Sequence, residues 1–189
     1  MTREARRALV ELLSQVVPVD DKEREDQARM LRFALELPEP LSRHQPTAHF
    51  TGSALVLSPD GERVCFVFHA KSQGWFQPGG HADPSDGDSI LKTTLREVSE
   101  ETSLSVDLHP SLPGPVHLDV HEFPAHSGEP AHQHLDVRFV MVAQNPDALR
   151  HDPAESHDAR WFTFGEGLER AGDESVRSLM RKARRRTMQ

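Results

Sequence analysis

One stretch of this sequence limits the fold more than any other: residues 79–104, GGHADPSDGDSILKTTLREVSEETSL. It joins a loop of glycines and acids to a segment in which apolar residues recur at helical spacing. On a helix of about 3.6 residues per turn, Glu97, Glu100 and Glu101 lie at i, i+3 and i+4 and share one face. The apolar stripe consists of Leu91, Leu95, Val98 and Thr102. We therefore predict a helix that packs along one face and presents three carboxylates along the other.

Three carboxylates on one helical turn have two interpretations. Charge runs usually form a solvated surface, although like charges at this spacing destabilise an exposed helix by about 0.2 to 0.5 kcal/mol per pair. The other interpretation is a hard divalent cation, because Mg2+ and Mn2+ prefer oxygen ligands and bind between protein carboxylates and substrate phosphates. The residues around the carboxylates favour the cation.

These residues resemble the Nudix box, G-x5-E-x7-R-E-U-x-E-E-x-G-U, in which U is a bulky aliphatic residue. The matching positions are Arg96, Glu97, Val98, Glu100, Glu101 and Leu104. Seven residues separate Asp88 from Arg96, so we expect Asp88 to replace the first Glu and the loop after Gly80 to be two residues longer. Ser103 replaces the Gly that normally ends the helix, so this departure concerns the helix end and not the metal site.

The resemblance implies a Nudix-type α/β/α sandwich with a mixed sheet, and a hydrolase that cleaves a nucleoside diphosphate linked to another moiety. It implies Mg2+ or Mn2+ as cofactor, with the ligands Gly80, Glu97, Glu100 and Glu101. Arg96 would orient the carboxylates. The general base would be Glu100 or Glu155, which precedes a Trp-containing strand. The alternative is a non-catalytic Nudix domain that acts as a nucleotide sensor.

The resemblance also bears on the substrate. Related hydrolases of ADP-ribose carry a Pro, and some hydrolases of dinucleoside polyphosphates a Tyr, at a fixed distance beyond the box. This chain has Asp119 and Val120 in that region and no Tyr at all. A nucleoside triphosphate or a nucleotide sugar therefore remains open.

Composition and net charge argue against several other classes of function. The chain has 189 residues and a net charge of -8, which suits one domain with an appendage and makes nucleic acid an unlikely partner. The basic stretch 181–186 is expected at a helix C-terminus, where cations are favourable. Cys65 is alone, and no apolar run approaches the roughly 20 residues that cross a bilayer. We expect a cytoplasmic protein with no membrane partner.

The rest of the chain divides into helical and strand-rich parts. Helices are predicted over residues 3–17 and from Asp20 to the residues before Pro38, followed by a linker over 38–46. Residues 1–45 would form a helical extension that caps the sheet and contributes to a homodimer contact, and 46–189 the Nudix domain. A hairpin is predicted over 54–68, two strands between 116 and 142, a short strand at 159–162 and a helix from about Asp173.

A second constellation is rich in histidine: five of the twelve histidines lie between His117 and His134. Strand alternation places polar residues on one side of each of two runs. They are His117, Asp119 and His121 in the first run, and His132, His134, Asp136 and Arg138 in the second. Pairing the runs across the loop at 124–130 would gather these residues on a single face.

We predict that this face binds the substrate. The candidate substrate-binding residues are His81, His121, His134, Asp136 and Arg138. Arg138 would hold a phosphate bidentately, and the imidazoles would hydrogen-bond a base or sugar. Two alternatives remain: a hydrated outer sheet face, and a Zn2+ site formed by His132, His134 and a third histidine.

Overall fold

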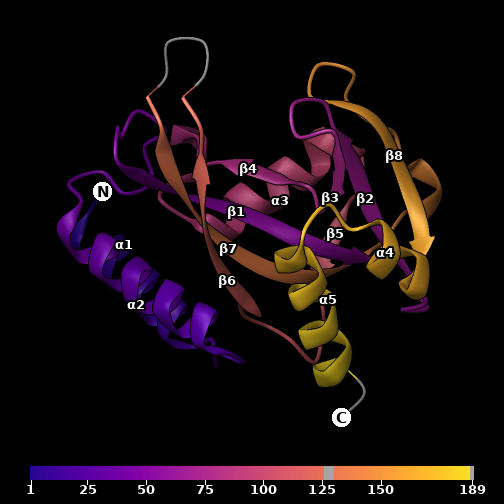
Figure 1. Ribbon diagram of the computed structural model, residues 1–189, viewed down its shortest axis with the longest axis horizontal. Coiled ribbons are helices and arrows are strands. Elements are labelled where there is room, and N and C mark those ends of the chain that lie inside the picture. Colours follow the sequence, from indigo (N-terminus) through magenta and orange to yellow (C-terminus); the bar gives the residue numbers. More distant parts are fainter. Residues whose placement is uncertain (126–129, 188–189) are drawn as a thin grey trace.

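The protein, described here by a computed structural model over residues 1–125 and 130–187, is built on a mixed sheet (Figure 1). Its strands are β1 (Ala48–Leu57), β2 (Arg63–His69), β3 (Gly74–Phe76), β4 (Gly79–His81), β5 (Val106–Leu108), β6 (His117–Phe123), β7 (His132–Ala143) and β8 (Ser156–Thr163). The main path runs β3-β2-β1-β7-β5, with β4 on β1, β6 on β7 and β8 on β2. This is the predicted α/β fold.

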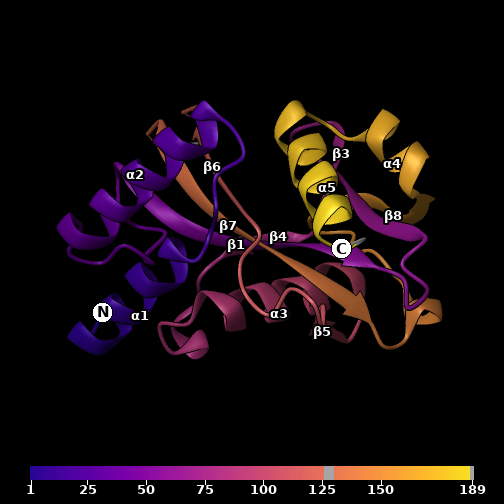
Figure 2. The same cartoon turned by 90° about the horizontal axis from the view of Figure 1, so that it is seen from below.

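Helices cover the sheet on both sides. They are α1 (Arg3–Ser14), α2 (Asp21–Glu36), α3 (Ile90–Thr102), α4 (Phe164–Arg170) and α5 (Glu174–Thr187), with short 3-10 turns at Pro84–Asp86 and Pro146–Ala148. Figure 2 shows α3 on one side of the central strands, and α2 and α5 on the opposite side. No helix in the described part of the chain is long and apolar enough to cross a membrane.

The centre of the sheet is the parallel pair of β1 and β7, which runs in register from Ala48↔Gln133 to Leu57↔Val142. All ten residues of β1 are buried, as expected for a strand covered on both faces. Helix α3 packs very closely on β1 at Gly52, where a Cβ would lie 2.4 Å from the Thr94 hydroxyl. The closeness of this packing fixes the distance between the acidic helix and the sheet.

Helix α3 forms where it was predicted. Ser89 caps its N-terminus, and the chain leaves the helix through Ser103 in the left-handed conformation, with φ of 57°. Ser103 thus occupies the conformation that usually selects glycine, and the helix still ends there. The acidic side is not simply solvated, because Glu97 and Glu101 are 8% and 4% exposed.

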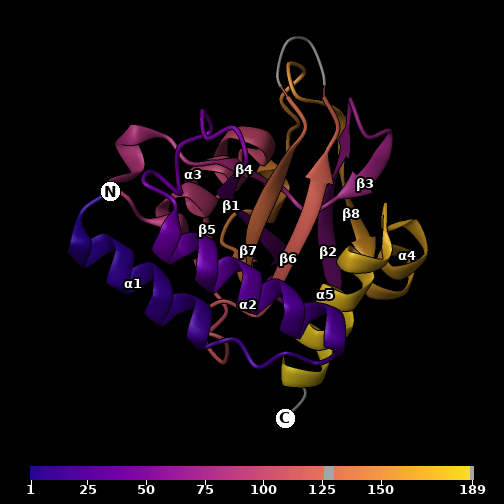
Figure 3. The same ribbon diagram turned by 60° about the vertical axis from the view of Figure 1, so that its left-hand side comes forward.

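The N-terminal helices cap an edge of the sheet, as expected (Figure 3). Strand β6 pairs with β7 on one side, and helix α2 lies along its other side. There the backbone N–H of Leu118 donates to Glu23 and that of Val120 donates to Asp26, at 3.2 and 3.1 Å. Two buried carboxylates thus take the place of a neighbouring strand and close the edge.

The C-terminal helix α5 packs its predicted apolar face onto the sheet. The buried residues of that face are Val176, Leu179, Met180 and Ala183. Its basic end is tied back locally: the Arg184 guanidinium lies 5.0 Å from the Phe164 ring centroid. The short elements β5 and α4 were not predicted, because runs this short carry too little periodicity to be recognised.

Candidate active site

Strand β4 brings two glycines against the acidic face of α3. The backbone N–H of Gly79 donates to Glu101 at 2.9 Å. At Gly80 a Cβ would lie 2.6 Å from the Glu97 carboxylate, so only glycine allows this carboxylate to lie against the backbone. The residue type at position 80 is therefore set by the side chain of Glu97.

Arg96 holds the surrounding carboxylates in place. Its Nη1 donates to Glu97 at 2.9 Å and to Glu100 at 2.7 Å, and its Nη2 donates to the carbonyl of His81 at 2.7 Å. Both Nε and Nη2 donate to Asp86. These contacts, above all that with Asp86, raise the pKa of Arg96 further. The role of orienter predicted for Arg96 fits this geometry.

The acidic partner of Arg96 is Asp86, and the prediction of Asp88 was wrong. Asp86 is 4% exposed and also accepts from the Thr93 hydroxyl at 2.9 Å. Asp88 is exposed, has φ of 61° and accepts from the Thr2 backbone at 3.4 Å. Asp86 follows Gly80 at the ordinary box spacing of five residues, so the two extra residues lie after the acid.

Burial makes it costly to ionise the carboxyl groups of this site when no cation is present. Burial is the main cause that raises the pKa of Glu97 to about 7, against the lowering effect of Arg96. It likewise raises the pKa of Glu101 to about 8, where the Gly79 N–H opposes the shift and the charge of Glu155 adds to it. A cation among these groups would remove the cost of ionising them.

Glu155 reaches the same site from a distant part of the sequence. Its carboxyl lies within hydrogen-bonding reach of Glu101 and close enough to Glu97 to affect its pKa. The backbone of its loop is held at the end of β2, where Ala70 N–H donates to the Glu155 carbonyl at 3.3 Å. The fold thus brings together four predicted carboxylates from two segments.

The donor set fits a hard divalent cation. The groups that converge are carboxylate oxygens and the backbone beside Gly80, and these are the ligands that Mg2+ and Mn2+ prefer. Burial raises the pKa values of Glu97 and Glu101, so a bound cation would stabilise the ionised carboxylates that hold it. Among the residues that the structure describes, neither a sulfur nor an imidazole belongs to this set.

The sequence profile of the NUDIX domain matches residues 48–183, which span the sheet, α3 and most of α5. The chain belongs to the NUDIX hydrolase family. No curated protein matches it. The match begins at β1, so the N-terminal helices of this Nudix hydrolase lie outside the matched region.

Solved structures show the same fold. An Ap4A hydrolase of C. elegans, solved as a binary complex, has a TM-score of 0.55 at 18% identity, covering 72% of this chain and 95% of that chain. A NUDIX-family hydrolase from Clostridium perfringens has a TM-score of 0.53 at 19% identity, covering 71% of this chain and 93% of that chain. The NUDIX domain of Shewanella oneidensis NrtR complexed with ADP ribose has a TM-score of 0.51 at 19% identity, covering 73% of this chain and 87% of that chain.

The second constellation of this Nudix hydrolase assembles as predicted. Strands β6 and β7 are antiparallel, and their register places His117 opposite Arg138, Asp119 opposite Asp136 and His121 opposite His134. The face is not a hydrated surface, because four of these residues are below 5% exposed: His117, Asp119, Asp136 and Arg138. Part of the predicted connecting loop, residues 126–129, lies outside the described residues.

Arg138 is used inside the protein, so we do not retain its predicted phosphate contact. Its Nε donates to Asp136 at 2.7 Å, its Nη2 to Asp119 at 3.1 Å and its Nη1 to Ser175 at 2.7 Å. Burial alone would lower the pKa of Arg138, but the two carboxylates raise it. Asp136 also accepts from the Ser53 hydroxyl at 2.8 Å. The two residues join β1, β6, β7 and α5 instead of facing a ligand.

The predicted histidines His81 and His134 come into contact, with Nε2 to Nε2 at 3.2 Å. Burial lowers the pKa of His81 to about 3 and that of His134 to about 2. His121 donates from Nδ1 to the Asp119 carboxylate at 3.0 Å, and its side chain is 42% exposed. Sequence analysis missed His49, although its alternation with Thr51 and Ser53 along β1 is the signal that places it on this face.

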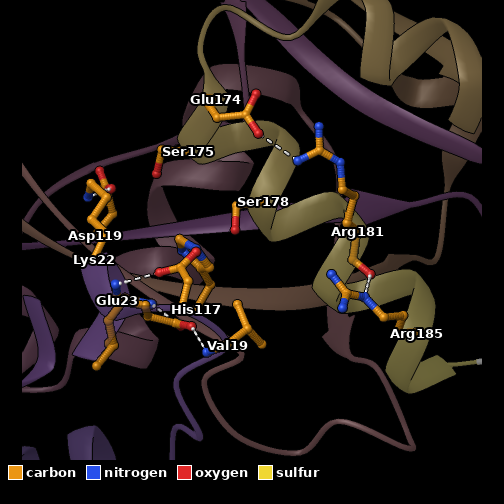
Figure 4. Close-up of a pocket in the computed structure, with 12 residues that line it drawn as sticks. Val19, Lys22, Glu23, His117, Asp119, Glu174, Ser175, Ser178, Arg181 and Arg185 are labelled. Atoms are coloured by element: carbon orange, nitrogen blue, oxygen red, sulfur yellow. Dashed lines mark hydrogen bonds and ion pairs between the residues drawn. The ribbon is translucent and has the colours of Figure 1, made fainter. Parts of the chain in front are cut away.

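A pocket of about 270 Å3 lies between α2, β6 and α5 (Figure 4). Its wall includes Lys22, His117, Ser175, Ser178 and Arg181. The Nδ1 atom of His117 is buried and has no hydrogen-bond partner among the described residues. In Figure 4 the Arg181 side chain is paired with Glu174 across α5. The pocket mixes acidic and basic groups and does not include the box carboxylates.

Proposed function

We propose that this Nudix hydrolase is a divalent-metal-dependent pyrophosphohydrolase that cleaves a nucleoside diphosphate linked to another moiety. The observation that carries the proposal is the convergence of Glu97, Glu101 and Glu155 beside the Gly79–Gly80 backbone, with two of the carboxyl pKa values raised. A catalytically idle binding domain has no need for such a costly cluster of acids.

The proposed ligands of Mg2+ or Mn2+ are Glu97, Glu100, Glu101 and the Gly80 backbone. When bound, the cation would neutralise phosphate oxygens and acidify a water molecule. Arg96 keeps Glu97 and Glu100 turned to the same side, through contacts of 2.9 and 2.7 Å. Burial of Glu97 and Glu101 removes competing water, which strengthens their attraction for a cation.

Glu155 is the proposed general base, in preference to Glu100. The Glu100 carboxylate is paired with the Arg96 guanidinium at 2.7 Å, which occupies one of its oxygens. Glu155 instead faces other carboxylates from a separate loop. That loop can approach a water molecule from outside the ligand set, as a proton acceptor requires.

For the substrate, a nucleotide-linked diphosphate agrees with the structures of similar fold. Those structures include an Ap4A hydrolase and a domain with bound ADP ribose. Of the predicted substrate residues, we propose that His121 contacts the base or sugar, because its ring is partly exposed while Asp119 fixes its orientation. His81 and His134 lie beside it and shape the same region.

The test is a panel of nucleoside triphosphates, nucleotide sugars and dinucleoside polyphosphates incubated with Mg2+ or Mn2+. Release of a nucleoside monophosphate or of pyrophosphate is measured by chromatography. We expect metal-dependent turnover that falls at least about 1000-fold in Glu101→Gln, because a ligand and a buried charge are lost together. The exposed variant Glu169→Gln serves as control. Tight nucleotide binding without turnover in the wild-type protein would instead establish the sensor.

A further inference from the structure

Four histidines from three strands converge next to the box loop. They are His49 of β1, His81 of β4, and His132 and His134 of β7. His49 and His134 are directly opposite each other in the parallel β1–β7 pair. The ring centroid of His49 lies 4.9 Å from the centroid of each of the other three. The polar alternation of the strands therefore directs all four rings to one place.

Two pairs of ring nitrogens have close to the spacing of ligands around one ion. The His134 Nε2 lies 3.2 Å from Nε2 of His81 and 3.1 Å from Nε2 of His132. One ligand atom each from His49, His132 and His134 can be chosen within 4.8 Å of one another. Around a tetrahedral Zn2+ with bonds of about 2.0 to 2.1 Å, two ligand nitrogens are about 3.3 to 3.4 Å apart.

Hydrogen bonds alone account poorly for these contacts. A ring nitrogen has a single in-plane site, which holds either one proton or one lone pair. The Nε2 of His134 cannot therefore make good hydrogen bonds to His81 and His132 at the same time. Three lone pairs directed at a shared cation satisfy all three rings at once.

The outer side of His132 has the contact expected for a metal ligand. Its Nδ1 lies 2.8 Å from the carbonyl oxygen of Pro130. A proton on Nδ1 donates to that carbonyl and leaves the lone pair on Nε2, which points at His134. Neutral imidazole, with a free lone pair on one nitrogen, is the form that binds metals.

We propose that His49, His132 and His134, with His81 as fourth ligand, bind one Zn2+ or a similar transition-metal ion at a site separate from the box carboxylates. The two sites differ in chemistry, because nitrogen donors favour zinc, cobalt, nickel and copper whereas carboxylates favour magnesium and manganese. The bound ion would fasten β4 to β1 and β7. The carbonyl of His81 accepts from Arg96 at 2.7 Å, so the same ion would steady the box loop.

The test is the metal content of the purified full chain. The protein is stripped with a chelator, dialysed against Zn2+ and then against metal-free buffer, and analysed by mass spectrometry. We expect about one zinc per chain in the wild type and in His44→Ala, an exposed control, and loss of most of that zinc in His49→Ala, His132→Ala and His134→Ala. His132 is only partly buried, so His132→Ala provides a readout if the other two variants fold poorly.

Cobalt gives a second readout and separates this site from the proposed active site. Co2+ in a four-coordinate nitrogen site absorbs visible light far more strongly than six-coordinate Co2+ in an oxygen site. Glu97→Gln should keep zinc and the cobalt spectrum while losing turnover, and His132→Ala should lose both metal signals. Zinc content well below one per chain in the wild type, or equal zinc in His132→Ala, would overturn the histidine site and leave the proposed hydrolase untouched.

Discussion

Arg96 binds Asp86 through two nitrogens, Nε to Oδ1 at 3.0 Å and Nη2 to Oδ2 at 3.1 Å. This bidentate contact fixes the plane of the guanidinium, whose remaining donor holds Glu97 and Glu100. Asp86 is fixed in turn by the Thr93 hydroxyl and by the backbone N–H of Asp83. The geometry of the acidic site thus depends on a carboxylate outside the acidic cluster.

Replacing Asp86 should reduce activity without removing a ligand. In Asp86→Asn the guanidinium loses its bidentate carboxylate partner, so Glu97 and Glu100 are less well oriented and metal-dependent turnover should fall about 10- to 100-fold. The measurement is kcat and KM against Mg2+ concentration. Asp88→Asn is the matched control, since Asp88 is exposed and two residues away. Equal effects of the two variants would contradict the role of Asp86.

The pH dependence of stability should reveal the buried acids. Glu97 and Glu101 have pKa values of about 7 and about 8 when folded, against an ordinary 4.5. The folded protein therefore holds protons that the unfolded chain has lost, so stability should fall as the pH rises. Between pH 7.5 and 9, above the ordinary titration of histidine, the fall should be about 1 kcal/mol in metal-free buffer.

Urea unfolding at several pH values measures this effect. Mg2+ should flatten the dependence, because the cation binds the ionised carboxylates and favours the folded state. Glu101→Gln should also flatten it, while Glu169→Gln should not. A metal-free stability that is constant or rises across this pH range would show that the two acids are not protonated in the folded protein.

Gly80 should tolerate no side chain. In Gly80→Ala the new Cβ would meet the Glu97 carboxylate at 2.6 Å, so the carboxylate must move and turnover should fall about 100-fold. Gly165→Ala is a suitable control because a Cβ there meets nothing within 4 Å. The comparison is made by kinetics and by Mg2+ titration. Wild-type turnover in Gly80→Ala would exclude a tight approach of Glu97 to this loop.

Much of the site could be predicted because many of its residues lie close together in the sequence. Glu97, Glu100 and Glu101 are fixed relative to one another by a single helix, and the register of β6 against β7 follows from alternation. Glu155 could be placed only by resemblance, because no local pattern connects its loop to α3. The pairing of β1 with β7 joins segments about 80 residues apart and leaves no signal at either one.

The choice between Asp86 and Asp88 shows where residue counting fails. The 3-10 turn Pro84–Asp86 is followed by Gly87 and Asp88, both left-handed with φ of 62° and 61°. This reversal of the chain accommodates the two extra residues. Asp88, which has the expected sequence separation from Arg96, therefore points away from Arg96. Counting from the Gly80 side would have found Asp86. Sequence spacing predicts which residues are neighbours within the helix, but it does not do so across the turn that precedes the helix.

Ser103 should store a small amount of strain. A non-glycine residue in the left-handed region costs roughly 1 to 2 kcal/mol, so Ser103→Gly should stabilise the protein by about 1 kcal/mol. Urea unfolding is the measurement, and Ser103→Ala, which keeps the Cβ, should bring no gain. Destabilisation by Ser103→Gly would mean that the serine side chain contributes more than its backbone costs.

The buried pair of Glu23 and Lys182 should tie the N-terminal helices to the Nudix domain. Lys182 Nζ lies 2.5 Å from Glu23, both side chains are at most 3% exposed, and burial lowers the pKa of Lys182. Lys182→Met would leave the Glu23 carboxylate buried with only backbone partners, which should cost about 3 to 5 kcal/mol. Arg181→Met removes the neighbouring exposed pair with Glu174 and should cost about 0 to 1 kcal/mol.

Adding Glu23→Gln to Lys182→Met should restore part of the lost stability, because the uncompensated charge is then absent. Urea unfolding followed by tryptophan fluorescence reports on the domain, since Trp75 and Trp161 both lie outside the N-terminal helices. A single shared transition is expected, with the helices and the sheet unfolding together. If Lys182→Met cost no more than Arg181→Met, the helices would be an independent appendage and the closure of the β6 edge by α2 would not contribute to the stability of the domain.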